Sequence, residues 1–144
     1  MSLGIRLIEP RDYPLLEEFL YFAALLPQLG TPPPREDIYK PEIYVYIDGF
    51  GGKNDFGFVA EEEGQVIAAA WARLIVADGH VDGDTPELVV AVLPGHQGKG
   101  LGKMLITRLL GLLCERGYER VSLSVEKRNP AVRLYERLGF KAVQ

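Results

Sequence analysis

The chain has 144 residues, about the length of one domain, and its 47% hydrophobic and 25% charged residues exclude a disordered protein. Its single cysteine excludes an internal disulfide framework and a four-thiolate zinc site. The net charge of −4 argues against a general nucleic-acid binder, and the sequence shows neither a membrane-spanning apolar stretch nor a signal peptide. We therefore expect one cytoplasmic domain, residues 1–144, without a nucleic-acid or membrane partner.

The charges are divided unevenly along the chain. Residues 1–94 hold 6 basic and 16 acidic residues, whereas residues 95–144 hold 10 basic and 4 acidic residues. This division indicates an anionic ligand on the C-terminal half and a cationic ligand on the N-terminal half, or else surface charges that merely fall unevenly.

The first half of the chain predicts a strand, two helices and a β-hairpin. The strand covers residues 5–8, and a helix begins at Pro10, because proline is tolerated in a first helical turn. The apolar stripe of this helix consists of Leu15, Leu16, Phe19, Leu20, Phe22 and Ala23. A second, shorter helix is expected over residues 41–50, and hairpin strands are expected over residues 56–61 and 65–76.

The second half predicts strands that alternate with helices. Residues 88–93 are almost wholly apolar, which indicates a central strand. A helix follows over residues 99–116, and its core-facing residues are Leu101, Leu105, Leu109 and Leu112. A strand over residues 121–125, a short helix over residues 129–139 and a final strand over residues 140–143 complete the order β-α-α-β-β-β-α-β-α-β. This is an α/β fold with a mixed sheet.

Two features that could carry chemistry are set aside. Three aspartates in the polar loop, Asp78, Asp82 and Asp84, resemble part of a calcium loop, but Val89 stands where such a loop needs glutamate. No metal is therefore expected. Cys114 lies in the long helix, where we expect it to be a small core residue.

A glycine-rich turn between the central strand and the long helix is the main chemical signal. Gly98, Gly100 and Gly102 alternate there, and two lysines are interleaved. Backbone N–H groups at the start of a helix bind anions, and glycine lets a pyrophosphate approach them. The P-loop is excluded because Met104 replaces its serine or threonine, and the glycine spacing does not fit the dinucleotide-binding fingerprint.

Two segments resemble motifs of the GNAT superfamily of N-acetyltransferases. Its acetyl-CoA motif, Arg/Gln-x-x-Gly-x-Gly/Ala, is matched by Gln97-Gly98-Lys99-Gly100-Leu101-Gly102, behind a strand that ends Ala91-Val92-Leu93-Pro94. Residues 129–140 resemble the family segment that ends Leu-Tyr-x-x-Leu-Gly-Phe. The resemblance implies a GNAT-like fold and transfer of an acetyl group from acetyl-CoA to a primary amine by direct attack.

The resemblance also implies roles for individual residues. The residues it assigns to the cofactor are Val90, Ala91, Val92, Gln97, Gly98, Lys99, Gly100, Leu101, Gly102, Lys103 and Asn129. The first three would pair with the pantetheine arm, and the turn would hold the pyrophosphate. Tyr135 matches the tyrosine that protonates the departing thiolate, and Glu87 lies where the family often places a carboxylate base.

Several alternatives stay open. Asn129 stands six residues before Tyr135 where seven is common, so it is either a cofactor ligand or a helix cap, and Tyr135 itself also fits the core face of its helix. His80 or water could replace Glu87 as the base, whereas His96 lies on the wrong side. The family usually has one more strand after the position of Gln144, which is either absent here or supplied by a partner, such as a second copy in a homodimer.

The sequence also leaves the identity of the amine acceptor undetermined. We expect its pocket to come from the N-terminal helices and the hairpin, although each of their aromatic residues taken singly fits the core better than a ligand contact. These residues are Tyr39, Tyr44, Tyr46, Phe50 and Trp71. The acceptor would be a small-molecule or peptide amine. The alternative function is a non-catalytic module that binds or senses acyl-CoA.

Overall fold

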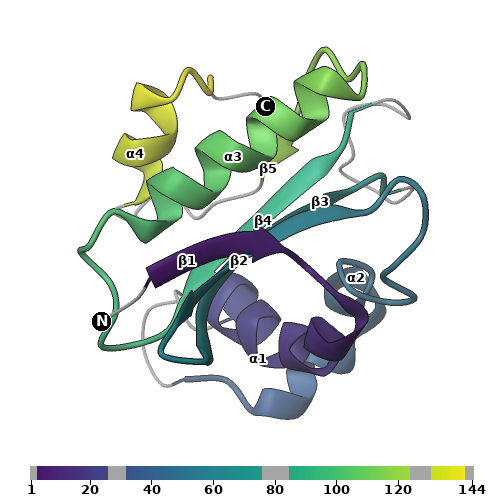
Figure 1. Cartoon of the computed structure of the whole chain (residues 1–144). Coiled ribbons are helices and arrows are strands. Elements are labelled where there is room, and N and C mark those ends of the chain that lie inside the picture. Colours follow the sequence, from purple (N-terminus) through teal and green to yellow (C-terminus); the bar gives the residue numbers. More distant parts are fainter. Residues whose placement is uncertain (1–2, 26–31, 76–84, 124–130, 142–144) are drawn as a thin grey trace.

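The computed structural model describes residues 3–25, 32–75, 85–123 and 131–141 (Figure 1). They form a five-stranded mixed sheet with the strand order β1-β2-β3-β4-β5. The strands are β1 (Leu3–Leu7), β2 (Phe56–Glu62), β3 (Gln65–Arg73), β4 (Glu87–Val92) and β5 (Ser122–Leu123). The pairs from β1 to β4 are antiparallel, and β5 runs parallel to β4. The predicted α/β fold with a mixed sheet is confirmed.

Helices cover both faces of this sheet. Their bounds are η1 (a 3₁₀ helix, Pro10–Leu15), α1 (Leu16–Leu20), η2 (a π-helix, Tyr21–Leu25), η3 (a 3₁₀ helix, Arg35–Tyr39), α2 (Pro41–Tyr44), α3 (Leu101–Glu115) and α4 (Ala131–Arg137). Figure 1 shows α1 and α2 on one face and α3 with α4 on the other. None of the described helices is long and apolar enough to cross a membrane. Phe140 and Lys141 are not in a strand, and the rest of the predicted final strand lies outside the described residues.

The core on the α1 face is built around Trp71 of β3. Its side chain is fully buried and packs with Leu16, Phe19 and Leu20 of α1. The prediction that Leu15 belongs to the buried apolar stripe is wrong, because its side chain is 41% exposed. Leu15 is the last residue of the 3₁₀ helix η1. A 3₁₀ helix has three residues per turn, so the side chain of Leu15 does not lie on the same face as the buried side chains of α1.

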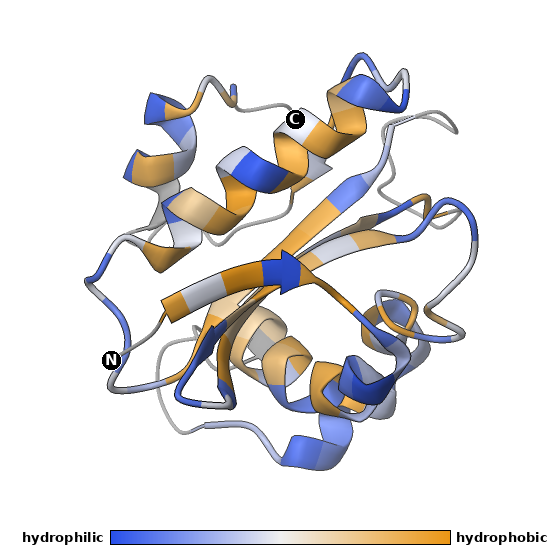
Figure 2. Ribbon diagram, viewed as in Figure 1, coloured by the Kyte–Doolittle hydropathy of each residue, from blue (hydrophilic) through white to orange (hydrophobic). Residues whose placement is uncertain are grey.

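The core on the other face is the contact between α3 and the sheet. Leucines every four residues along α3 are buried against β2, β3 and β4, namely Leu101, Leu105, Leu109 and Leu113. Figure 2 shows this apolar side of α3 facing the sheet. The predicted stripe ended at Leu112, which is only half-buried, because a strict four-residue spacing continues to Leu113. Cys114, the next residue, is exposed, so the expectation that it belongs to the core is wrong.

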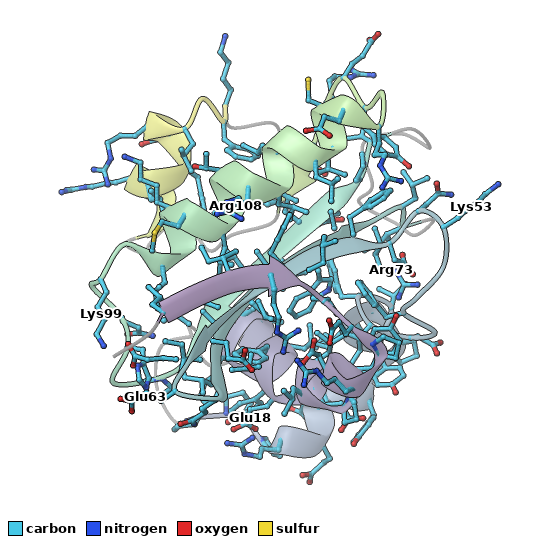
Figure 3. The ribbon with its side chains drawn as sticks, viewed as in Figure 1. Glu18, Lys53, Glu63, Arg73, Lys99 and Arg108 are labelled. Atoms are coloured by element: carbon cyan, nitrogen blue, oxygen red, sulfur yellow. The ribbon has the colours of Figure 1, made fainter. Side chains whose placement is uncertain are left out.

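The uneven charge of the sequence also appears in space. Figure 3 shows Lys99 and Arg108 on the α3 side of the sheet and Glu18 on the α1 side. Lys99 and Arg108 belong to the basic C-terminal half, and Glu18 belongs to the acidic N-terminal half. The sheet therefore separates a basic helical layer from an acidic one.

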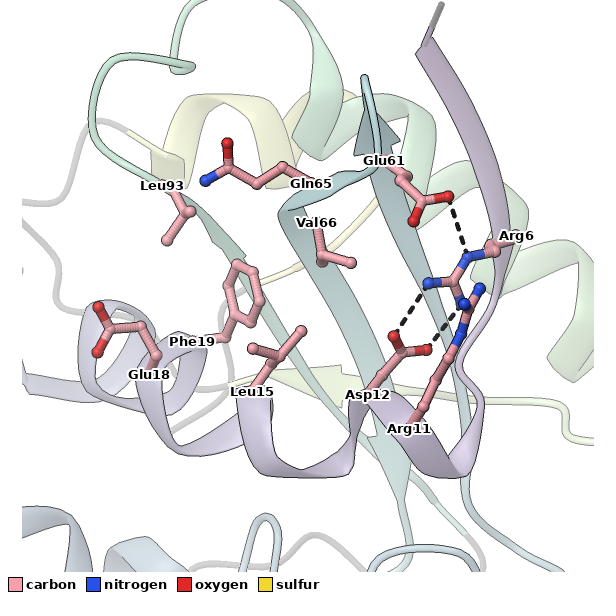
Figure 4. Close-up of a pocket in the computed structure, with 11 residues that line it drawn as sticks. Arg6, Arg11, Asp12, Leu15, Glu18, Phe19, Glu61, Gln65, Val66 and Leu93 are labelled. Atoms are coloured by element: carbon pink, nitrogen blue, oxygen red, sulfur yellow. Dashed lines mark hydrogen bonds and ion pairs between the residues drawn. The ribbon is translucent and has the colours of Figure 1, made fainter.

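A buried carboxylate anchors the first helical segment to the edge of the sheet. Asp12 is only 3% exposed and accepts hydrogen bonds from two guanidinium nitrogens of Arg6, at 2.7 and 3.0 Å, and from the backbone N–H of Glu9 at 2.8 Å. Arg6 also reaches Glu61 of β2 at 3.5 Å, beside a cavity of about 450 Å³ (Figure 4). The hydrogen bonds from Arg6 lower the pKa of Asp12.

Replacing Asp12 by asparagine is expected to lower the free energy of unfolding by roughly 2–3 kcal/mol at neutral pH, because hydrogen bonds to charged groups are lost. A lowered folded-state pKa means that Asp12 stabilises the protein above the carboxyl's ordinary pKa, and that this stabilisation is lost as the pH falls through the folded-state pKa. The deficit of the variant should therefore shrink in acid. Urea unfolding at several pH values measures the difference in the free energy of unfolding between the variant and the wild type. Glu63→Gln, at an exposed site, is the control. A deficit of equal size in acid would contradict this account.

Candidate active site

The glycine turn, residues 94–100, connects β4 to α3. Gly95, Gly98 and Gly100 have φ values of 89°, 82° and 80°, in the left-handed region that favours glycine. Gly100 is the N-cap residue of α3. A Cβ atom at any of these three positions would meet nothing within 4 Å, so the turn is open on the side where a side chain would stand. The backbone conformation therefore favours glycine, and the open space leaves room for a ligand.

Positive charge surrounds this turn. The side chains of Lys99 and Lys103 are exposed, and the N-terminal end of the 15-residue helix α3 adds its partial positive charge. Leu101 is buried in the core, so it can offer a ligand only its backbone N–H. These groups together can hold a diphosphate.

Two side chains of the turn contact the protein itself. The amide nitrogen of Gln97 donates to the carbonyl oxygen of Val92 at 3.3 Å, which closes the turn onto the end of β4. The Nδ1 atom of His96 lies 3.8 Å from a carboxylate oxygen of Glu62, at the tip of the β2–β3 hairpin. Of these two contacts, the hydrogen bond from Gln97 fixes the position of the turn relative to the sheet.

Within the part of the chain that the structure describes, one side of β4 is unpaired beyond its first two residues. Val90, Ala91 and Val92 are paired with β3 on one side. On the other side, β5 is paired only with Glu87 and Leu88. Among the described residues, no strand therefore covers that side of β4 beyond Leu88. An extended ligand can add there as a strand, with its far end at the glycine turn.

Tyr135 lies on α4, which packs against the first turn of α3. A Cβ atom on Gly102 would stand 3.9 Å from Leu134, which shows how closely the two helices approach. Tyr135 is 9% exposed, and its ring meets the Phe140 ring edge to face at 6.1 Å. Its hydroxyl has no hydrogen-bond partner among the described residues, and burial raises the pKa of the phenol.

Glu87 is the first residue of β4 and is buried, with 7% exposure. Its carboxylate accepts a hydrogen bond from the Tyr46 hydroxyl at 2.9 Å. It lies at the opposite end of β4 from the glycine turn. The structure thus places the two groups of residues predicted from the sequence at the two ends of one strand.

An arginine that sequence reasoning missed supports Tyr46. The guanidinium of Arg73 is paired with both carboxylate oxygens of Asp55, at 3.1 and 3.2 Å, and donates to the carbonyl oxygen of Asp48 at 2.7 Å. The indole N–H of Trp71 donates to the carbonyl oxygen of Tyr46 at 2.9 Å. Two residues of β3 therefore hold the segment that carries Tyr46. The sequence gives no signal for contacts between residues so far apart.

The aromatic residues expected around the acceptor divide between surface and core. Tyr39 and Tyr44 form a ring pair at 5.5 Å, and Tyr39 is 56% exposed. Trp71 is fully buried, which agrees with the expectation that each of these aromatic residues is more a core residue than a ligand contact. His80 and Asn129 lie outside the described residues. The described residues contain no group of histidine, cysteine, aspartate and glutamate side chains suited to a metal ion.

Comparisons with known proteins agree with this geometry. The family model described as "Acetyltransferase (GNAT) family" matches residues 20–140. A mycothiol acetyltransferase of Saccharomonospora viridis is 41% identical over 108 residues, which cover 72% of this chain and 33% of that protein. The chain thus spans about a third of the length of this relative.

Solved structures show the same fold. The ribosomal-protein-S18-alanine N-acetyltransferase of Escherichia coli has a TM-score of 0.70 and 25% identity, over 99% of this chain and 80% of that chain. A predicted acetyltransferase of Clostridium acetobutylicum, crystallised with acetyl-CoA, has a TM-score of 0.71 at 21% identity, over 99% and 92% of the two chains. With the strand, turn and helix described above, these matches show that the chain belongs to the GNAT acetyltransferase family.

Proposed function

We propose that this protein is an N-acetyltransferase that moves the acetyl group of acetyl-CoA to a primary amine. The observation that carries the proposal is the open glycine turn, which ends a strand whose second side no other described strand covers beyond Leu88. Acetyl-CoA has the matching shape, an extended amide-bearing arm that ends in a pyrophosphate. The C. acetobutylicum neighbour crystallised with acetyl-CoA supports this choice of co-substrate.

In this proposal, the backbone of β4 at Val90–Val92 pairs with the pantetheine arm, and the N–H groups of residues 98–103 hold the pyrophosphate. Lys99 and Lys103 neutralise its charge. Acetyl-CoA supplies an activated thioester. The neutral amine forms a C–N bond with the acetyl carbon while the C–S bond breaks, and the amine loses a proton as the sulfur gains one.

Two side chains are proposed to move these protons. Tyr135 gives its phenolic proton to the departing sulfur. Burial raises the pKa of this phenol, so the phenol is protonated at neutral pH. Glu87, held by Tyr46, accepts the proton of the amine directly or through water. Asn129 is proposed as a further cofactor contact.

The acceptor is proposed to be a primary amine on a small molecule or a peptide. The names of the relatives support both classes, because one is a mycothiol acetyltransferase and another acts on an alanine of a ribosomal protein. The test is release of free CoA thiol from acetyl-CoA with a panel of small amines, peptide N-termini and lysine peptides. Thiol release that requires an amine supports the proposal. Tight acetyl-CoA binding without turnover across the panel would instead favour a non-catalytic acyl-CoA sensor.

Replacing Glu87 by glutamine is expected to lower turnover by about tenfold to a hundredfold near neutral pH, because the base is lost while the volume is kept. The deficit should shrink as the pH rises, since the acceptor then arrives already deprotonated. Initial rates from acid to alkaline pH measure it. Tyr46→Phe, which keeps the carboxylate and removes its hydrogen bond, is expected to show a smaller deficit. A Glu87→Gln deficit that does not change with pH would contradict the role of a base.

A further inference from the structure

A groove runs along the outer side of α3, between this helix and the edge of the sheet. Its volume is about 810 Å³. Ile5 of β1 and Phe58 of β2 form one wall, and a single face of α3 forms the other. Gly111 lies in that helical face and brings no side chain into the groove.

Exposed apolar side chains gather at this groove. Among the described residues, the large apolar side chains with high exposure are Leu3, Leu7, Leu15, Tyr39 and Met104. Met104 lines the groove, at 38% exposure. Leu3 and Leu7, at 47% and 53% exposure, share the strand face of Ile5, because side chains alternate along a strand. Such a concentration of exposed apolar surface is typical of a binding site.

The wall formed by β1 is also an open sheet edge. β1 is the first strand in the sheet order and is paired only with β2 among the described strands. The N–H of Ile8 donates to the carbonyl oxygen of Gly57 in β2. Hydrogen-bonded positions alternate in an antiparallel pair, so the backbone groups of Ile5 and Leu7 point away from β2. The Leu7 carbonyl oxygen accepts a hydrogen bond from the Arg6 guanidinium at 3.2 Å, and the other groups have no partner among the described residues and can pair with another extended chain.

The groove has a net positive charge, which favours an acidic ligand. Lys99, Lys103 and Arg108 border it, against one carboxylate, Glu115, at its far end. None of the three cations forms an ion pair with another described residue. Pairing with the β1 strand of a second copy fits poorly, because that strand carries an arginine and no carboxylate to neutralise these cations.

We propose that this groove binds an extended acidic peptide, which adds to β1 as a further strand of the sheet. Alternate apolar side chains of the peptide would lie on Ile5 and Met104. Its carboxylates would face the cations along the first half of α3, where the helix dipole adds to the attraction. Strand addition of this kind combines backbone hydrogen bonds for affinity with side-chain contacts for specificity.

The test uses the full chain without acetyl-CoA, because Lys99 and Lys103 also border the glycine turn. The probe is a short fluorescein-labelled peptide of alternating glutamate and valine, and the measurement is fluorescence anisotropy at low and high salt. Saturable binding that weakens with salt is expected. Arg108→Glu should weaken it about tenfold or more. Lys53→Glu, the same change at an exposed lysine distant from the groove (Figure 3), should leave it unchanged.

Two matched peptides separate strand addition from simple attraction. A peptide with lysine in place of glutamate should bind at least about tenfold more weakly. A glutamate–valine peptide with alternate backbone nitrogens methylated keeps the charge but cannot complete the hydrogen bonds, so its binding should be lost. Amide hydrogen exchange at Ile5 and Leu7 should slow when the unmodified peptide is bound.

Several results would overturn the proposal. They are equal binding of the acidic and basic peptides, equal binding of the methylated peptide, or no saturation at about 1 mM peptide. A dimer in sedimentation that Met104→Glu dissociates would assign the groove to a second copy. Binding of anionic lipid vesicles without binding of the acidic peptide would assign it to a membrane surface.

Discussion

Replacing Gly100 by aspartate is expected to abolish acetyl-CoA binding and to leave the protein folded. The backbone at Gly100 has a φ of 80°, which aspartate tolerates better than most residues, and a Cβ atom would meet nothing within 4 Å. Aspartate is also a good residue at a helix N-cap, which is the position of Gly100. The fold therefore has little reason to fail.

The ligand, in contrast, would meet a carboxylate where its pyrophosphate must lie. Two like charges a few ångströms apart in a partly closed site repel strongly, and the new side chain also fills the open space of the turn. Calorimetry measures the affinity for acetyl-CoA, and thermal unfolding followed by circular dichroism checks the fold. Unchanged affinity in a folded Gly100→Asp variant would remove the glycine turn from the cofactor site.

Two controls separate charge from conformation. Gly100→Asn brings the same strain and nearly the same volume without the charge, so it should weaken binding much less than aspartate does. Gly117→Asp makes the same change at the other end of α3, where φ is 92° and a Cβ atom also meets nothing within 4 Å. Its affinity for acetyl-CoA should equal that of the wild type.

Replacing Tyr135 by phenylalanine should lower turnover by roughly 10²-fold, at the lower end of the 10²–10⁴ range for a general acid. The lower end is expected because a CoA thiolate is a tolerable leaving group and water can partly replace the phenol. Affinity for acetyl-CoA should change much less, since the loss concerns the transition state. Rates measured where the chemical step limits turnover, together with calorimetry, test this directly.

The surroundings of Tyr135 allow the hydroxyl to be removed without a change in packing. Its hydroxyl has no hydrogen-bond partner among the described residues, so phenylalanine breaks no hydrogen bond to them and keeps the ring packed against Phe140. Stability should be nearly unchanged. Phe140→Leu serves as a packing control, because it disturbs the ring pair and leaves the phenol in place. Near-wild-type turnover of Tyr135→Phe would leave Tyr135 a core residue only.

Much of the fold could be predicted from local sequence signals. The hairpin of β2 and β3 and the extent of α3 follow from periodicity and from glycines with positive φ, such as Gly64 and Gly117. Errors arose where a small geometric difference decides exposure. Leu15 is exposed because a 3₁₀ turn precedes α1, and Cys114 is exposed because it lies one residue beyond the buried position of Leu113.

The candidate site was predictable only in part. The glycine turn is local in sequence, so its backbone geometry could be inferred directly. The support of Glu87 was not predictable, because it depends on contacts between distant residues, such as Tyr46 with Glu87 and Arg73 with Asp55. Only the pairing of β3 with β4 brings these side chains to one end of the sheet.

If acetyl-CoA binds along β4 as proposed, its supply also affects how much of the protein stays folded. The backbone of Val90 and Val92, which no described strand covers on that side, is otherwise a template for another chain and a starting point for aggregation. A ligand that occupies this side in the folded state alone stabilises that state by about 2.7 kcal/mol when its concentration is about 100 times its Kd. A cell rich in acetyl donor would thus keep more of this protein folded, whereas starvation would expose it to proteases and aggregation.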